Sequence, residues 1–68
     1  MPETLLLIAG MRCEHCSEVV RRAIRSVDGV ERVRTDGPSR LAVEHRATAG
    51  AASLIAAVER EGYRAAVA

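Results

Sequence analysis

The sequence predicts a small α+β fold with the element order β-α-β-β-α-β. Three observations support this class: two stretches repeat apolar residues at helical spacing, short β-type runs flank each stretch, and Gly-containing turns separate the segments. The 68 residues are enough for one domain, 1–68, and leave no room for a second. Because the chain contains no Trp or Phe, we expect an aliphatic core.

In the first half we expect a strand at residues 4–9, apolar on both faces as central strands tend to be, and a helix at 14–27. The helix follows from apolar residues at i, i+3, i+4, i+7, i+8 and i+11, which form one stripe. The stripe consists of Cys16, Val19, Val20, Ala23, Ile24 and Val27. Gly29 ends the helix, since glycine suits the left-handed position after a C-terminus.

In the second half we expect strands at 30–35 and 40–45, separated by the turn cluster 36–39. Leu41 and Val43 alternate with polar or small residues, as in a strand with one buried face. Thr48 is the expected cap of a helix at 50–61, which Gly62 ends before a short strand at 63–67. The expected buried stripe of this helix is Ala51, Leu54, Ile55 and Val58.

The element order predicts a ferredoxin-like sandwich. With right-handed crossovers, both helices pack on the same face of a four-stranded antiparallel sheet. Leu5 and Leu7 then point to the face that the helices leave uncovered, where the twist of the sheet hides them in part.

The two cysteines, Cys13 and Cys16, lie within Gly-Met-Arg-Cys-Glu-His-Cys at residues 10–16, where the strand pattern gives way to the helix pattern. A helix N-terminus favours negative charge, so thiolate is the expected reactive form. Two sulfurs at this spacing suit one soft metal ion. The C-x-x-C spacing by itself also occurs in redox motifs and in zinc half-sites. A structural disulfide between the two cysteines is not expected, because it would close only a tiny ring and add almost no stability.

With its Gly-Met lead-in, this segment resembles the Gly-Met-x-Cys-x-x-Cys signature of the heavy-metal-associated domain family, and within it the small bacterial copper chaperones. Gly29-Val30 followed by Val33, and Gly62-Tyr63, extend the resemblance over essentially the whole chain. Thr35 departs from it, because a second Val is common there. The resemblance implies the ferredoxin-like fold, metal binding by Cys13 and Cys16, and no enzymatic activity.

Copper(I) is the expected metal, because it binds stably to two thiolates in a near-linear site. Zinc prefers four ligands, and Arg12 cannot provide one. Family members that handle zinc or cadmium often carry Asp at the Arg12 position. Mercury(II), which also favours two sulfurs, is the nearest alternative, with zinc less favoured. An alternative from another class is a small thiol oxidoreductase with Cys13 as the attacking thiol.

Four further side chains are candidates for lesser roles. Met11 is expected to pack in the core instead of binding metal. His15 is either an exposed loop residue or an auxiliary ligand in a metal-bridged dimer, while His45 is expected at the surface or sheet edge. The resemblance places Tyr63 in the loop that faces the metal, where its ring would shield the thiolates; the alternative is an ordinary edge-strand tyrosine.

The net charge of +1 favours neither nucleic acid nor a membrane surface as partner, and residues 1–4 carry no targeting signal. We therefore expect a cytoplasmic protein, monomeric unless a metal bridges two copies. The resemblance implies delivery of copper(I) to a P-type copper ATPase or its metal-binding domain by thiolate exchange. Arg21, Arg22 and Arg25 either steer an acidic partner or form a solvated face on which Glu18 pairs with Arg22.

Overall fold

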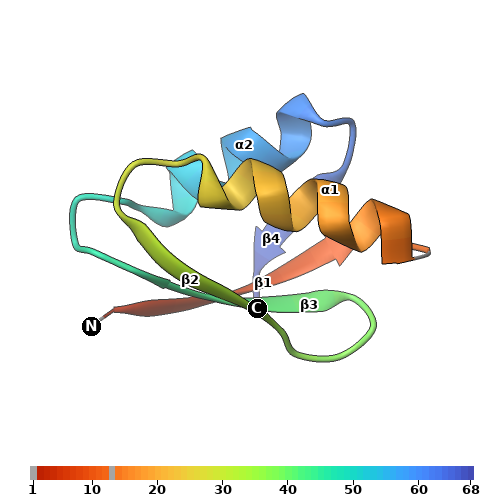
Figure 1. Cartoon of the computed structure of the whole chain (residues 1–68), viewed down its shortest axis with the longest axis horizontal. Coiled ribbons are helices and arrows are strands. Elements are labelled where there is room, and N and C mark those ends of the chain that lie inside the picture. The colour runs from red at the N-terminus through yellow and green to blue at the C-terminus, as the bar shows by residue number, and fades with distance from the viewer. Residues whose placement is uncertain (1, 13) are drawn as a thin grey trace.

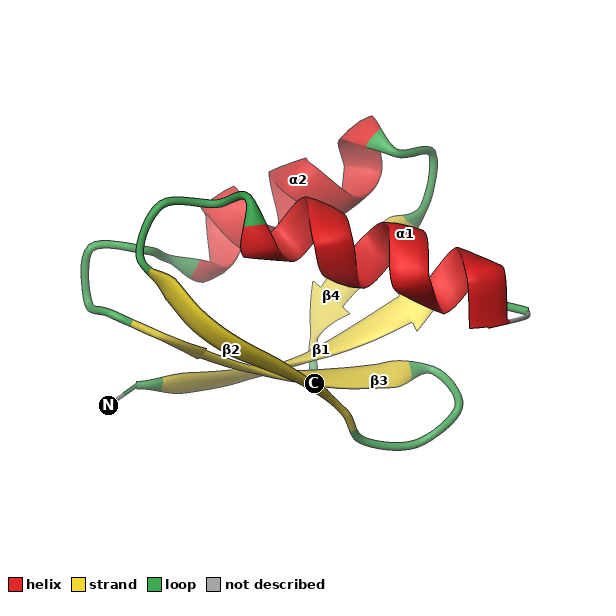
Figure 2. Cartoon of the chain, in the orientation of Figure 1, coloured by secondary structure: helices red, strands yellow, loops and turns green. Residues whose placement is uncertain are grey.

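The computed structural model describes residues 2–12 and 14–68, and it has the predicted order of elements. The elements are β1 (Glu3–Ala9), α1 (Glu14–Arg25), β2 (Val30–Thr35), β3 (Arg40–His45), α2 (Ala51–Arg60) and β4 (Arg64–Val67). Both helices lie on one side of the sheet (Figures 1 and 2). The ferredoxin-like arrangement is therefore confirmed.

The sheet has the strand order β2-β3-β1-β4, and every neighbouring pair is antiparallel. The side-chain alternation of β1 places Leu6 and Ile8 toward the helices, where they are buried. Leu7 points the other way and is 44% exposed, as expected for a residue on the uncovered face. The central position of β1 brings its C-terminal end, which leads into the cysteine segment, beside β4 and the start of α1.

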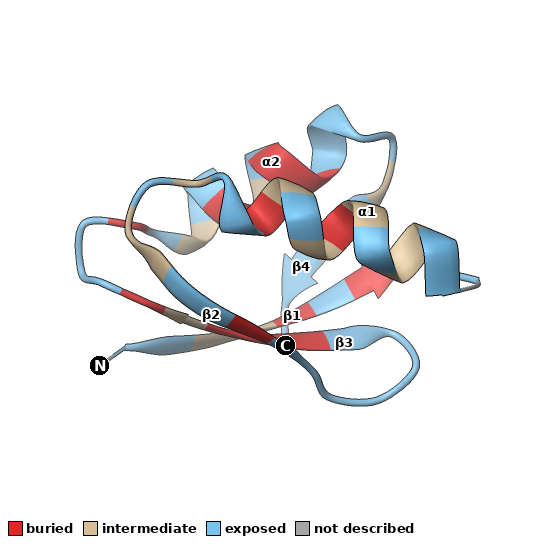
Figure 3. Ribbon diagram, viewed as in Figure 1, coloured by how far each residue is buried: buried red, intermediate tan, exposed pale blue. Residues whose placement is uncertain are grey.

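The core between the sheet and the helices is aliphatic, as predicted. Its buried members are Leu6, Ile8, Val20, Ile24, Val33, Leu41, Val43, Leu54 and Val58. Buried positions alternate with exposed ones along both helices (Figure 3), as expected for helices that each pack one face on the sheet. Since burial of one such side chain contributes about 1.5–3 kcal/mol, this layer supplies most of the driving force for folding.

α1 ends two residues before the predicted position. The Ser26 hydroxyl donates to the Ala23 carbonyl at 2.6 Å, and the Val27 amide donates to the Ile24 carbonyl at 3.0 Å. These short-range bonds tighten the last turn, and Gly29 then adopts a φ of +97°. Val27 still packs against the core from outside the helix.

The prediction that Thr48 caps the second helix is wrong. The residue before α2 is Gly50, whose backbone is extended and which makes no side-chain cap. The chain first closes a turn in which the Ala49 amide donates to the Arg46 carbonyl at 3.0 Å, and the side chain of Ala49 is buried. With that alanine buried, the cap position lies two residues after Thr48, and the helix begins at Ala51 instead of residue 50. Ala57, absent from the predicted stripe, is also buried.

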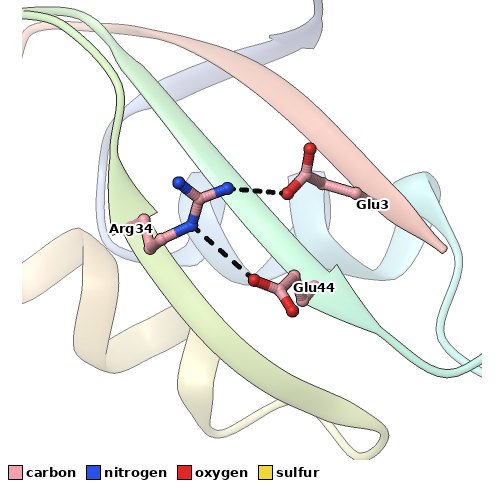
Figure 4. Close-up of polar contacts among 3 residues, drawn as sticks. All are labelled: Glu3, Arg34 and Glu44. Atoms are coloured by element: carbon pink, nitrogen blue, oxygen red, sulfur yellow. Dashed lines mark hydrogen bonds and ion pairs between the residues drawn. The ribbon is translucent and has the colours of Figure 1, made fainter. Parts of the chain in front are cut away.

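The uncovered face of the sheet is partly closed by its own polar side chains. Arg34 on β2 reaches across β3 and holds Glu44 at 3.6 Å and Glu3 of β1 at 2.9 Å (Figure 4). Ala42 lies between Leu5 and Arg34 in the strand register and is only 2% exposed. The ion pairs of Arg34 with Glu3 and Glu44 therefore cover part of the apolar sheet face that no helix covers.

Candidate metal centre

The loop after β1 begins beside core side chains: Gly10 lies close to the Tyr63 ring, and Met11 packs against the core. Gly10 has a φ of +94°, and a Cβ there would lie 3.3 Å from Cδ1 of Tyr63. Met11 is half-buried and packs against the core, as does Tyr63. Glycine is required here because the backbone is left-handed and passes close to the aromatic ring. The expectation that Met11 packs inward is confirmed. Tyr63 lies beside Gly10 at the start of the loop, and the role of its ring as a shield of the thiolates stays a prediction.

Cys16 lies in the first turn of α1, which begins at Glu14. It is half-buried and occupies the same helix stripe as Val20, whose side chain is in the core. Its partner in the motif, Cys13, lies outside the described residues. The structure thus places one predicted ligand at the helix start, where the helix dipole stabilises a thiolate. The ligand role of both cysteines stays a prediction.

The variable residues of the motif, Arg12, Glu14 and His15, are exposed. Over the described ranges 2–12 and 14–68, no group of three or more His, Cys, Asp or Glu side chains is close enough to hold a metal ion. The described part of the chain therefore contains no cluster of the kind that holds zinc, and it contributes the Cys16 sulfur in the first turn of α1.

The expectation that His45 lies at the surface is wrong. His45 is 5% exposed, and its Nε2 lies 2.7 Å from Oγ1 of Thr4 while its Nδ1 lies 2.9 Å from the Arg46 carbonyl oxygen. Because a carbonyl only accepts, Nδ1 is the donor there, and in the neutral ring Nε2 accepts from the Thr4 hydroxyl. Both nitrogens are thus used within the fold.

The sequence contained a signal for this burial. His45 continues the alternation of Leu41 and Val43, both of which face the helices. Thr4 lies six residues before Gly10, so the histidine is about 20 Å from the cysteine loop at about 3.3 Å per strand residue. It is a structural residue, and it is too distant from the cysteines to share a metal with them.

The three arginines predicted on the exposed side of α1, Arg21, Arg22 and Arg25, lie in two different environments. Arg22 and Arg25 are exposed, and Arg22 pairs with Glu18 at 3.9 Å, as expected. Because 80% of the Arg22 side chain is exposed, its ion pair with Glu18 adds little stability. Arg21 is half-buried instead, and its Nη1 donates to Oγ1 of Thr35 at 3.1 Å. The placement of Arg21 on the solvated face is therefore wrong: its side chain spans from α1 to β2.

Comparisons with known proteins agree with this geometry. The family model of the heavy-metal-associated domain matches residues 5–64. The N-terminal domain of PacS from Synechocystis PCC6803 is 32% identical over 100% of this chain and 98% of its own, with a TM-score of 0.89. A structure solved in work on crosstalk between Cu(I) and Zn(II) homeostasis is 30% identical over 100% of both chains, with a TM-score of 0.94.

A copper-binding domain of HMA7, a P-type ATPase, is 22% identical over 100% of this chain and 95% of its own. At a TM-score of 0.92 this likeness is one of fold. Within the described residues, neither helix is long and apolar enough to cross a membrane.

Proposed function

The chain belongs to the heavy-metal-associated domain family, and from this we propose that it is a metallochaperone that binds one copper(I) ion through Cys13 and Cys16. The observation that carries the proposal is the position of the motif: Cys16 lies half-buried in the first turn of α1, three residues after Cys13 and just beyond a loop anchored by Met11.

The chemistry of this position favours a soft monovalent ion. Thiolates are the softest ligands that a protein offers, and the helix start stabilises their charge. Copper(I) accepts two of them in a near-linear site. Zinc would be left half-coordinated, because it prefers four ligands and the exposed Arg12 cannot supply one.

We further propose that the ion passes to a P-type copper ATPase or its metal-binding domain in a reducing cytoplasm, where thiols stay available. A two-coordinate ion can take an incoming thiolate as a third ligand before it releases the first. No free ion forms, because each copper–sulfur bond to Cys13 or Cys16 is broken only after a bond to a thiolate of the acceptor has formed. The protein therefore acts by binding and delivery, without catalytic turnover.

The test is a titration of the reduced protein with copper(I) against a competing chelator, together with X-ray absorption of the loaded protein. We expect one ion per chain and two sulfur neighbours, with both signals lost in Cys13→Ser. Nitrogen or oxygen neighbours in place of sulfur would refute the proposal, as would unchanged affinity in that variant.

Mercury(II) is the alternative cargo, since it also favours two sulfurs. Competition among copper(I), mercury(II) and zinc separates the three. Copper(I) should displace zinc at comparable free concentrations, and Arg12→Asp should raise zinc affinity more than copper(I) affinity by adding an oxygen ligand. A small thiol oxidoreductase would instead turn over a disulfide substrate, which a chaperone does not do.

A further inference from the structure

The face of the sheet opposite the helices has no second layer over it among the described residues (Figure 2). Side-chain alternation along β1 places Glu3, Leu5, Leu7 and Ala9 on this face. Leu7 is exposed, and Leu5 beside it is only half-buried. Ala66 of β4 lies opposite Leu7 in the strand register, so the face has an apolar centre.

The two ends of this face carry opposite charges. At the N-terminal end of β1, Glu3 and Glu44 share the single guanidinium of Arg34, at 2.9 and 3.6 Å, so one negative charge is left over (Figure 4). At the other end, Arg64 of β4 lies opposite Ala9 in the register and therefore on the same face. Because β1 is 7 residues long, the two ends lie about 20 Å apart.

Two nearby charged groups leave this polarity in place. Arg40 of β3 also lies on the face, opposite Leu7, and Asp36 offsets its charge at 3.7 Å. Glu59 lines a hollow together with Arg64, but it belongs to α2 on the other side of the sheet. Among the described residues, Arg64 forms no ion pair. Its charge is therefore available at this end of the face.

We propose that this sheet face binds the same face of a second copy of the chain, with the strands of the two copies antiparallel. A two-fold axis that crosses β1 between Leu5 and Leu7 brings Leu5 against the partner's Leu7. The same axis brings Arg64 toward the partner's Glu3. A parallel arrangement would instead place Glu3 against the partner's Glu3, which like-charge repulsion disfavours. The charge pattern is thus complementary to itself in one orientation.

The size of the face sets the strength of the contact. The chain extends over 30 × 22 × 17 Å, and a twisted sheet face of that size buries less than the ~800 Å² per partner of a standard stable interface. With Leu5 and Leu7 as the main apolar contacts, we expect a weak dimer with a Kd of about 0.1–1 mM.

The antiparallel orientation keeps the two cysteine loops apart. Ala9, at the end of the face that carries Arg64, leads directly into Gly10 and the loop. The two loops then lie at opposite ends of the dimer, in contrast to a dimer in which a metal bridges the two copies. Formation of this dimer therefore requires no metal, and it can be tested independently of the proposed function.

The test uses the reduced, metal-free full chain. Sedimentation equilibrium from about 10 μM to about 1 mM should show a monomer–dimer equilibrium. Leu7→Gln should weaken the dimer about fivefold or more, because it removes apolar contact area. The matched control is Val67→Gln. Val67 is also exposed, but it lies opposite Leu6 and so on the other face, and its substitution should leave the dimer unchanged.

Charge reversal tests the orientation. Arg64→Glu places like charges together at both ends of the antiparallel dimer and should weaken it about fivefold. The double variant Arg64→Glu, Glu3→Arg restores opposite charges across the interface and should recover the dimer. In a mixture of isotope-labelled and unlabelled chains, filtered NOE spectra should connect the Leu5 methyl groups to the partner's Leu7.

Four results would overturn the inference. A chain that stays monomeric up to about 1 mM would leave this face to a different occupant. Equal effects of Leu7→Gln and Val67→Gln would remove the face from the interface, and an Arg64→Glu variant that dimerises as well as the wild type would remove the charge pairing. A dimer that forms only with copper(I) would be bridged by the metal. Because metal is absent from the main test, a chain that dimerises but does not bind copper(I) would refute the proposed function alone.

Discussion

β1 has two ends, and each adjoins side chains of kinds that bind metals in proteins. At its C-terminal end, Gly10 leads into the loop of Cys13 and Cys16. At its N-terminal end, Thr4 lies against the buried His45. The histidine has both ring nitrogens bonded inside the fold, whereas Cys16 is half-buried at the start of a helix.

The difference teaches that residue type alone does not make a metal site. A potential ligand that is buried with both ring nitrogens hydrogen-bonded stabilises the structure, whereas a thiol half-buried in the first turn of a helix is positioned to bind an ion. If this distinction is correct, substitutions at the two ends should separate metal affinity from stability.

The largest effect is expected at Cys16. Cys16→Ser should lower copper(I) affinity more than about 100-fold, because changes to groups that only support metal ligands already cost about 10–100-fold. The melting temperature of the metal-free protein should change by only a few degrees, since the substitution is nearly isosteric at a half-buried site. Chelator competition and thermal unfolding measure the two quantities. A large loss of stability with unchanged affinity would reverse the assignment of this end.

The reverse pattern is expected at the other end. His45→Ala leaves the Thr4 hydroxyl and the Arg46 carbonyl without their partner and opens a cavity, which should cost about 3 kcal/mol of unfolding free energy. For a chain of this size the melting temperature should fall by about 15 °C. Copper(I) affinity, measured below that temperature, should stay within about twofold of the wild-type value, because a stably folded chain has an unaltered metal loop.

Thr4→Val is the matched control for His45, since it removes one partner without a change of shape and should cost about 1 kcal/mol. A histidine variant that binds copper(I) much more weakly, while the Thr4 variant does not, would mean that the two ends of β1 are coupled.

The smallest predicted difference is between two alanine variants, and it distinguishes the effect of a close contact from that of backbone strain. Gly10 and Gly37 have similar φ angles of +94° and +103°, but an added Cβ would meet the Tyr63 ring only at Gly10. Both alanine variants should lose about 1–2 kcal/mol from the left-handed backbone. Gly10→Ala should lose about 1 kcal/mol more by overpacking and bind copper(I) a few-fold more weakly, because the loop shifts. Equal stability and affinity in the two variants would show that the contact with Tyr63 has no influence on the loop.

Much of the fold follows from local pattern. The strands Val30–Thr35 and Arg40–His45 have the predicted bounds, because the two-residue alternation and the turn residues between them are set by backbone geometry. The apolar stripe of α1 likewise predicted which face meets the sheet, and the strand-to-helix junction placed Cys16 in the first helical turn. The motif and its neighbours were thus predictable as a candidate site, although the ligand role of the cysteines stays a prediction.

The remaining features depended on contacts between distant segments. The alternation along β3 already favoured a buried His45, but its hydrogen-bond partner Thr4 lies 41 residues away. Arg21 likewise turns inward because Thr35 of β2 lies within reach. α2 begins only after Gly50 because the turn before it buries the side chain of Ala49 in the core. Sequence periodicity reports which face of an element is apolar, and it determined the layers of this protein. The partner of a polar side chain becomes known only when the layers are assembled, so the tertiary structure alone decided which distant polar groups pair with one another.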